Sequence, residues 1–237
     1  TLACAHIYNK VKRNWLATAL LFALPLGTMA QEDPLYLMEA GGALGLVTYL
    51  GDFNAGIFSG VQPMGGLVMR RVLNPYMHLR LAAFTGQIKG SSKDVATYYP
   101  AFAASPYSFN HRLTNVDVAY EYNFWPYGTG RDYRGAQTLT PYVAGGLGFT
   151  HVSGGEKNVV AANIFLGLGV KYKVAQRLNL ALQWGVHFAT TDKIDGVADP
   201  YAVKSVGLFK NKDGYSTLEL SLTYSFMAKC RTCNKDD

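Results

Sequence analysis

A strict alternation of apolar with polar or small side chains between residues 178 and 188 is the feature that most constrains the fold. One face carries Leu178, Leu180, Leu182, Trp184, Val186 and Phe188, and the other carries Asn179, Ala181, Gln183, Gly185 and His187. A period of two over this length predicts one β-strand whose two faces meet different surroundings.

The same alternation recurs along the chain and predicts eight strands. They cover residues 36–50, 65–74, 77–87, 115–124, 140–152, 163–174, 178–188 and 217–226. Several reach the roughly 9–11 residues with which a tilted strand crosses a bilayer, and they exceed the common soluble strand of about five or six.

Alternation alone does not separate a soluble β-sandwich from a membrane barrel, because both have one apolar face. Aromatic residues end the apolar faces at Phe124 and Trp125 and at Tyr224 and Phe226, as they do in the interfacial girdles of membrane barrels. The opposite faces mix glycine and alanine with charges, which suits a narrow lumen. We therefore predict an all-β fold, an eight-stranded antiparallel transmembrane β-barrel of the outer-membrane type over residues 31–229.

Eight charged residues fall on the faces that would point into such a barrel. They are Glu39, Asp117, Glu121 and Glu219 and the basic residues Arg70, Arg80, Lys171 and Lys173. Because acids and bases balance, they favour a plugged lumen over an open pore. The alternative is that these charges cover the solvated face of a sandwich.

Residues 10–30 have the layout of a secretory signal peptide. Basic residues precede an apolar run from Trp15 to Leu26, and small residues follow up to Ala30. Residues 1–9 would be an upstream extension, and a buried N-terminal helix is the alternative for the apolar run. Removing residues 1–30 lowers the formal charge from +6 to about +3, which is too mild to imply a nucleic-acid partner.

The connections predict that both termini lie in the periplasm. Residues 74–76 and 174–177 are tight turns, whereas the connections 51–63, 87–109, 153–158 and 190–214 on the opposite side are mostly long. Short periplasmic turns and long external loops are the outer-membrane rule. The connection 127–139 is a long, basic exception on the periplasmic side, and we expect partner contacts at Arg131, Asp132, Tyr133 and Arg134.

No motif for catalysis or for a cofactor stands out. His151, Ser153 and Glu156 are close in the sequence, but a catalytic triad is defined by geometry, and nothing in the sequence orients the histidine. His187 would face the lumen as a hydrogen-bonded histidine. We expect neither an enzyme nor a small-molecule substrate.

The tail 230–237 carries the pair Cys230 and Cys233 around Arg231. A second pair of ligands at zinc spacing is missing after residue 30, and redox pairs of this kind owe their reactivity to a helix N-terminus. In an oxidising compartment the pair predicts a local disulfide, with a link to a partner as the alternative. These three residues are further candidate partner contacts.

Several stretches together resemble one known family. The stretches YLMEAGGALGLVTYLGDFN, VDVAYEYNFWPYG, TPYVAGGLGFTH, GLGVKYKVAQRLNLALQWGVHFATTDKIDGVADP, LFKNKDGYSTLELSLTYSF and KCRTCN, in this order, resemble the PorG family of Bacteroidota outer-membrane proteins. The resemblance covers residues 35–234. It implies a non-enzymatic component of the type IX secretion system that anchors or orients a periplasmic ring of PorK and PorN type beneath the outer membrane.

Two other hypotheses remain open. A general surface barrel would act in adhesion or envelope stability through the loops 87–109 and 190–214. A lipid-modifying enzyme would use His151.

Overall fold

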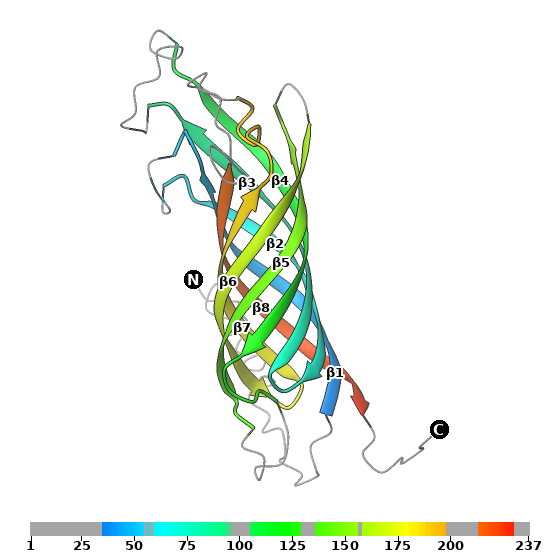
Figure 1. Ribbon diagram of the computed structural model, residues 1–237. Helices are drawn as coiled ribbons and strands as arrows, with labels where there is room; N and C mark the ends of the chain where they lie inside the picture. Colours follow the sequence, from blue (N-terminus) through cyan, green and yellow to red (C-terminus); the bar gives the residue numbers. More distant parts are fainter. Residues whose placement is uncertain are drawn as a thin grey trace, which may run out of the picture. The chain divides into compact units, whose positions relative to one another are not determined.

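Eight β-strands make up the regular structure of the part of the chain that the structure describes (Figure 1). They are β1 (Leu35–Leu50), β2 (Gln62–Asn74), β3 (Met77–Ser91), β4 (Ser108–Asn123), β5 (Leu139–Ser153), β6 (Val159–Ala175), β7 (Leu178–Ala189) and β8 (Gly214–Lys229). The computed structural model describes residues 35–54, 56, 59–93, 95, 105–128, 136–155, 158–197 and 213–229. The predicted signal peptide over residues 1–30 and the tail 230–237 lie outside these residues.

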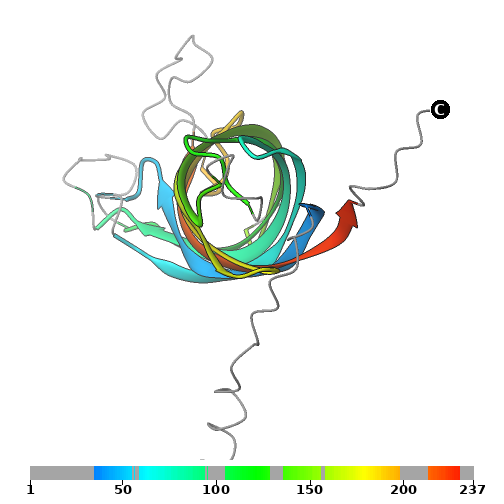
Figure 2. The ribbon, with the colours of Figure 1, turned by 90° about the horizontal axis from the view of Figure 1, so that it is seen from below.

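The strands form one closed antiparallel barrel in sequence order, which confirms the predicted fold (Figure 2). β8 closes the ring on β1, and their register runs from Leu35 opposite Lys229 to Leu50 opposite Gly214. Closure pairs the backbone groups of both edge strands, which a lipid environment requires. We call the end with Leu35 and Lys229 the terminal end, and the opposite end the loop end.

The outer face of the barrel is apolar. Leu44, Leu67, Val118, Leu147, Leu168, Leu182 and Leu220 are all exposed. The facing lumen holds buried charges such as Arg70 and Glu121. This is the reverse of a soluble protein, and it is the arrangement that lets a barrel span a lipid bilayer.

Strands β3 and β4 are longer than predicted. β3 continues to Ser91 and β4 begins at Ser108, so the two ends of the predicted loop 87–109, residues 87–91 and 108–109, are paired strand. The reason is visible in β4: Phe109 and Leu113 point inward while Arg112 points outward, so near the loop end the apolar face has changed sides. The predicted strand was too short because the prediction required one continuous apolar face, and that face ends where the apolar side chains turn inward.

Two glycines make room for aromatic rings inside the narrow barrel. A Cβ atom at Gly169 would lie 2.6 Å from the ring of Tyr142, and one at Gly185 would lie 2.5 Å from the ring of Phe165. Such close approach is possible only where the wall carries no side chain. The glycine-rich inner faces therefore position the aromatic groups of the site described next.

Candidate functional site: a filled lumen with an open mouth

The structure places all eight predicted lumen charges inside the barrel. Six of them, from β2, β3, β4, β6 and β8, form one network. Glu121 is its centre: Arg70 lies 3.1 Å from its carboxylate and Lys171 lies 2.6 Å from it. Arg80 lies 3.3 Å from Asp117 and 3.1 Å from Glu219.

The strand register explains why this network needs so many members. Arg70 and Arg80 are direct neighbours on β2 and β3, which is an unfavourable pairing of like charges. Glu121 of β4 pairs with Arg70, and Glu219 of β8 pairs with Arg80. Buried charges are tolerated only when they are paired and hydrogen-bonded, so the network is stable as a set.

The other two predicted charges, Glu39 and Lys173, lie toward the terminal end. Glu39 accepts a hydrogen bond from the Thr223 hydroxyl at 3.3 Å. Lys173 donates to the Asn179 side chain at 3.1 Å, and its ammonium group lies 5.6 Å from the centre of the Tyr127 ring.

Uncharged side chains that the sequence analysis did not select complete this part of the lumen. The Lys171 ammonium group lies 4.6 Å from the centre of the Tyr142 ring, and the Arg80 guanidinium lies 5.2 Å from that of Phe165. Tyr142 also donates to the Gln183 side chain at 2.8 Å. The alternation pattern could have identified these side chains as inward-facing, because each lies on the same strand face as a glycine or a charged residue.

His187 lies in the lumen, as expected for an interior histidine. Its ring is stacked on Tyr215, with 4.4 Å between ring centres and 13° between the ring planes. Its Nδ1 atom lies 3.4 Å from the Asn163 side-chain oxygen. The ring therefore has a packing role between the charged network and the loop end.

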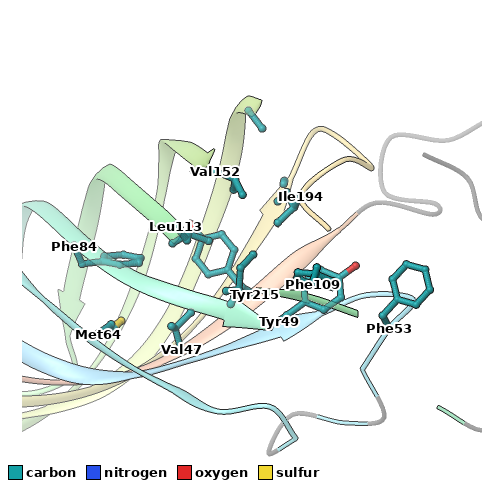
Figure 3. Close-up of a cluster of buried hydrophobic side chains, with 13 residues drawn as sticks. Val47, Tyr49, Phe53, Met64, Phe84, Phe109, Leu113, Val152, Ile194 and Tyr215 are labelled. Carbon is teal, nitrogen blue, oxygen red and sulfur yellow. The ribbon is translucent and has the colours of Figure 1, made fainter. Parts of the chain in front are cut away.

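The loop end of the lumen is closed by an apolar cluster (Figure 3). Its members are Val47, Tyr49, Phe53, Met64, Phe84, Ile88, Phe109, Leu113, Val152, Ala161, Ala189, Ile194 and Tyr215. Many of these residues lie on the same inward strand faces as the charged network, but closer to the loop end. The lumen is thus blocked by two layers of different chemistry, which fits the prediction of a plugged barrel.

A short segment after β7, residues 191–197, closes over this cluster and is held by two buried aspartates. The Tyr49 hydroxyl lies 2.9 Å from Asp195 and 2.5 Å from Asp213. The Ile194 amide donates to Asp213 at 2.9 Å, and Ile194 itself is fully buried in the cluster. We call residues 191–197 the cap.

One phenol carries one proton, so it cannot donate to both carboxylates at once. Burial raises the pKa of Asp195 to about 6 and holds the pKa of Asp213 well above its usual range, with the negative charge of Asp195 adding to the latter effect. A shared proton between the two carboxyls and Tyr49 satisfies the geometry.

The terminal end, in contrast, opens into a cavity of about 250 Å³. Leu37, Val72, Leu73 and Pro75 form apolar parts of its wall. Glu39, His78, Lys173 and Ser225 supply its polar groups, and Tyr127 and Gly128 line the side next to the connection 127–139. This cavity is the candidate functional site, because it is open, chemically mixed and at one end of a filled barrel.

The predicted partner contacts fall outside the described residues. Arg131, Asp132, Tyr133 and Arg134 belong to the middle of the connection, and Cys230, Arg231 and Cys233 belong to the tail. The flanks of the connection are described: Tyr127 forms a bridge with Gln137, and the Gln137 amide donates to Pro126 at 2.7 Å. These contacts and the disulfide stay predictions.

His151 projects outward from β5 into an exposed position, and Ser153 at the end of that strand is half-buried. Glu156 lies outside the described residues. No three His, Cys, Asp or Glu side chains in the described part of the chain are grouped so as to hold a metal ion. Among the same residues, no helix is long and apolar enough to cross a membrane.

Solved structures with a similar fold are bacterial β-barrels. The N-terminal barrel domain of OprF from Pseudomonas aeruginosa is 16% identical, with a TM-score of 0.44, and the alignment covers 81% of this chain and 99% of that one. Neisserial surface protein A is 14% identical, with a TM-score of 0.44 and coverage of 81% and 97%. Ail of Yersinia pestis, in complex with the heparin analogue sucrose octasulfate, is 9% identical, with a TM-score of 0.44 and coverage of 80% and 99%.

The comparison with curated proteins gave no match. A family model described as "Domain of unknown function (DUF6089)" matches residues 18–235, which include every strand of the barrel. The chain therefore belongs to the DUF6089 family.

Proposed function

We propose that the protein is a non-enzymatic, non-conducting barrel of the outer membrane whose terminal end faces the periplasm and holds a periplasmic protein. The observation that carries this proposal is the contrast between a filled lumen and an open cavity at one end. Ion pairs and the apolar cluster occupy successive parts of the lumen, which supports a barrel that does not conduct. The open cavity at the terminal end supports an interaction there.

The apolar outer face supports an outer-membrane location, because a closed barrel with lipid-facing leucines is the form that such proteins take. The resemblance to the PorG family supports the finer proposal. In it, the barrel is a component of the type IX secretion system and anchors or orients the PorK and PorN ring through its terminal end.

The chemistry of the cavity supports a protein ligand. Its walls combine apolar side chains with a carboxylate at Glu39 and an ammonium group at Lys173, the mixture that protein interfaces use for anchoring one side chain of a partner. The nearby connection and the tail with Cys230 and Cys233 would extend the contact.

A single substitution tests the cavity. Leu37→Trp puts an indole ring into its mouth and should abolish co-purification of the ring proteins with the intact barrel in detergent. Leu79→Trp is the matched control, because Leu79 is exposed on the apolar outer face, where an aromatic ring is tolerated. Undiminished co-purification by Leu37→Trp would contradict docking at the cavity.

A second variant tests the neighbouring segments. Replacing residues 129–136 by a glycine and serine segment of the same length leaves Tyr127 and Gln137 and the span between them in place, and Cys230→Ser with Cys233→Ser removes the thiols of the tail. If these changes weaken co-purification while Leu37→Trp does not, the partner contacts the segments and not the cavity. A steady ion conductance of the wild-type barrel in planar bilayers would contradict the non-conducting part of the proposal.

The long β3–β4 hairpin favours one alternative function. It extends the sheet at the loop end beyond the apolar belt (Figure 1), as expected for a surface barrel in adhesion or envelope stability. Replacing residues 96–104 and 198–212 by neutral loops, which leaves the cap and Tyr107 in place, would then remove surface binding and leave protein secretion unchanged.

A further inference from the structure

Charged residues are sorted between the two faces of the barrel wall. All the acidic residues of the eight strands, Glu39, Asp117, Glu121 and Glu219, are buried in the lumen. The charged strand residues exposed on the outer face, among those with described side chains, are the basic Arg71, Lys89 and Arg112. The outer wall therefore has a purely positive formal charge.

Two of these cations lie near the loop end, next to a histidine. Lys89, Arg112 and His151 are exposed on the adjacent strands β3, β4 and β5. Arg112 is directly opposite Gln87 on one side and Ser153 on the other. Lys89 and His151 are therefore diagonal neighbours of Arg112, at about 7–8 Å between Cα atoms, within the combined reach of these side chains.

The three residues lie just beyond the edge of the apolar belt, on the side of the loop end. His151 is paired with Thr114, and Thr114 is paired with Thr85. One outward position closer to the terminal end, β4 and β5 present Val116 and Phe149 to the outside. A side chain just beyond the apolar belt of a membrane barrel lies at the level of the lipid headgroups.

Nothing in the described part of the chain neutralises these groups. None of the three side chains forms an ion pair or hydrogen bond with another described residue, in contrast to the lumen charges. An arginine presents a planar donor pair that matches a phosphate, and a lysine adds a mobile point charge.

We propose that Lys89, Arg112 and His151 form a binding site for the phosphate of an anionic lipid headgroup in the leaflet at the loop end. The apolar belt holds the acyl chains beside the site. Arg112 is at its centre, and Lys89 and His151 lie diagonally on either side of Arg112. This proposal does not depend on the function of the terminal cavity or on which leaflet is external.

Lipid selectivity of the full-length barrel tests the site. The barrel is reconstituted in nanodiscs with equal amounts of phosphatidylglycerol and phosphatidylcholine, and the lipids that remain bound after extraction are counted by native mass spectrometry. Wild type should retain phosphatidylglycerol preferentially. The triple variant Lys89→Gln, Arg112→Gln and His151→Gln should lose about tenfold or more of this preference, because each cation near the surface contributes separately.

Arg71→Gln is the matched control, because Arg71 is exposed on the outer face toward the opposite end. It should keep the preference at the loop end. Unchanged selectivity of the triple variant, or an equal loss in Arg71→Gln, would overturn the proposal. Displacement of the retained lipid by millimolar inorganic phosphate would show that a free anion is the ligand. Retention of an acidic soluble protein, with no lipid preference, would show a protein-docking surface. Each of these outcomes also overturns the proposal.

A loss of selectivity through misfolding is separated by gel mobility. A folded barrel shifts its mobility only after heating, so each variant is compared unheated and heated. The triple variant should behave like wild type, because its three side chains are exposed on the outer face.

Discussion

The two halves of the lumen are filled by opposite chemistry, although the same strands run through both. Toward the terminal end the interior contains the ion pairs around Glu121, and the outer wall is apolar except for Arg71. Toward the loop end the interior contains the apolar cluster around Leu113, and the outer wall carries Lys89 and Arg112. The difference teaches that the surroundings of the outer face decide which side of a strand is apolar.

The physical reason is solvation on each side of one wall. Where lipid surrounds the barrel, polar side chains are stable only inside, and they must pair with one another. Where water surrounds the barrel, the hydrophobic effect turns apolar side chains inward, as in a soluble protein. β4 contains both arrangements, polar residues inward in one part and apolar residues inward in the other. Its alternation of buried and exposed residues is uninterrupted.

The largest effect should come from breaking the charged half. Glu121→Gln removes the carboxylate that pairs with Arg70 and Lys171 and leaves these cations buried and unpaired. We expect a loss of about 3–5 kcal/mol in the free energy of unfolding, because an uncompensated buried charge is strongly destabilising. Urea unfolding in lipid vesicles measures it.

Val118→Ala is the control for this prediction. Val118 lies on the same strand as Glu121 but points outward, so its truncation leaves the network intact. If both variants lose the same small amount of stability, the network does not stabilise the terminal half.

A somewhat smaller loss should come from breaking the apolar half. Leu113 is fully buried in the cluster, and Leu113→Ala should cost about 2–5 kcal/mol through lost burial and an internal cavity. Thr114→Ala, a change at an exposed position beside it, should cost far less. Equal effects of the two changes in urea unfolding would show that the loop-end interior is not packed as a core.

The smallest effect should be local and pH-dependent. Because burial raises the pKa of Asp195 in the closed cap to about 6 and also raises the pKa of Asp213, the protonated carboxyls favour the closed cap. This contribution is complete below the ordinary aspartate pKa near 4 and is lost as the pH rises through 6 and above. The neighbouring groups Asp52 and Asp192 add negative charge and act in the same direction.

Hydrogen exchange of the Ile194 amide, corrected for the intrinsic rate, measures this effect between pH 5 and 8. Protection should fall by up to about tenfold per pH unit for each carboxyl that ionises. The double variant Asp195→Asn and Asp213→Asn should flatten the profile, whereas Asp192→Asn should keep most of it. An unchanged profile in the double variant would show that the cap does not respond through the proton shared with Tyr49.

The fold could be predicted because each lipid-facing strand alternates apolar side chains toward lipid with polar or small side chains toward the lumen. The segment 178–188 needed only a one-residue extension at its end. The strand ends near the loop end could not be predicted well, since the inward face of β4 changes from Asp117 and Glu121 to Phe109 and Leu113. A pattern that changes sides resembles an irregular loop when no partner strand is visible.

The sequence by itself determined the eight strands, their inward charges and the apolar belt, because alternation is a local property of the chain. Only the tertiary structure decided which charges meet: Glu121 gathers Arg70 and Lys171 from strands far apart in the sequence, whereas Glu39 and Lys173 stay at the mouth. It also brought Tyr49 to Asp195 and Asp213, and Lys89 beside Arg112. When a barrel closes, the strand register and the width of the lumen decide which side chains lie opposite one another. The sequence of a single strand predicts neither of these quantities.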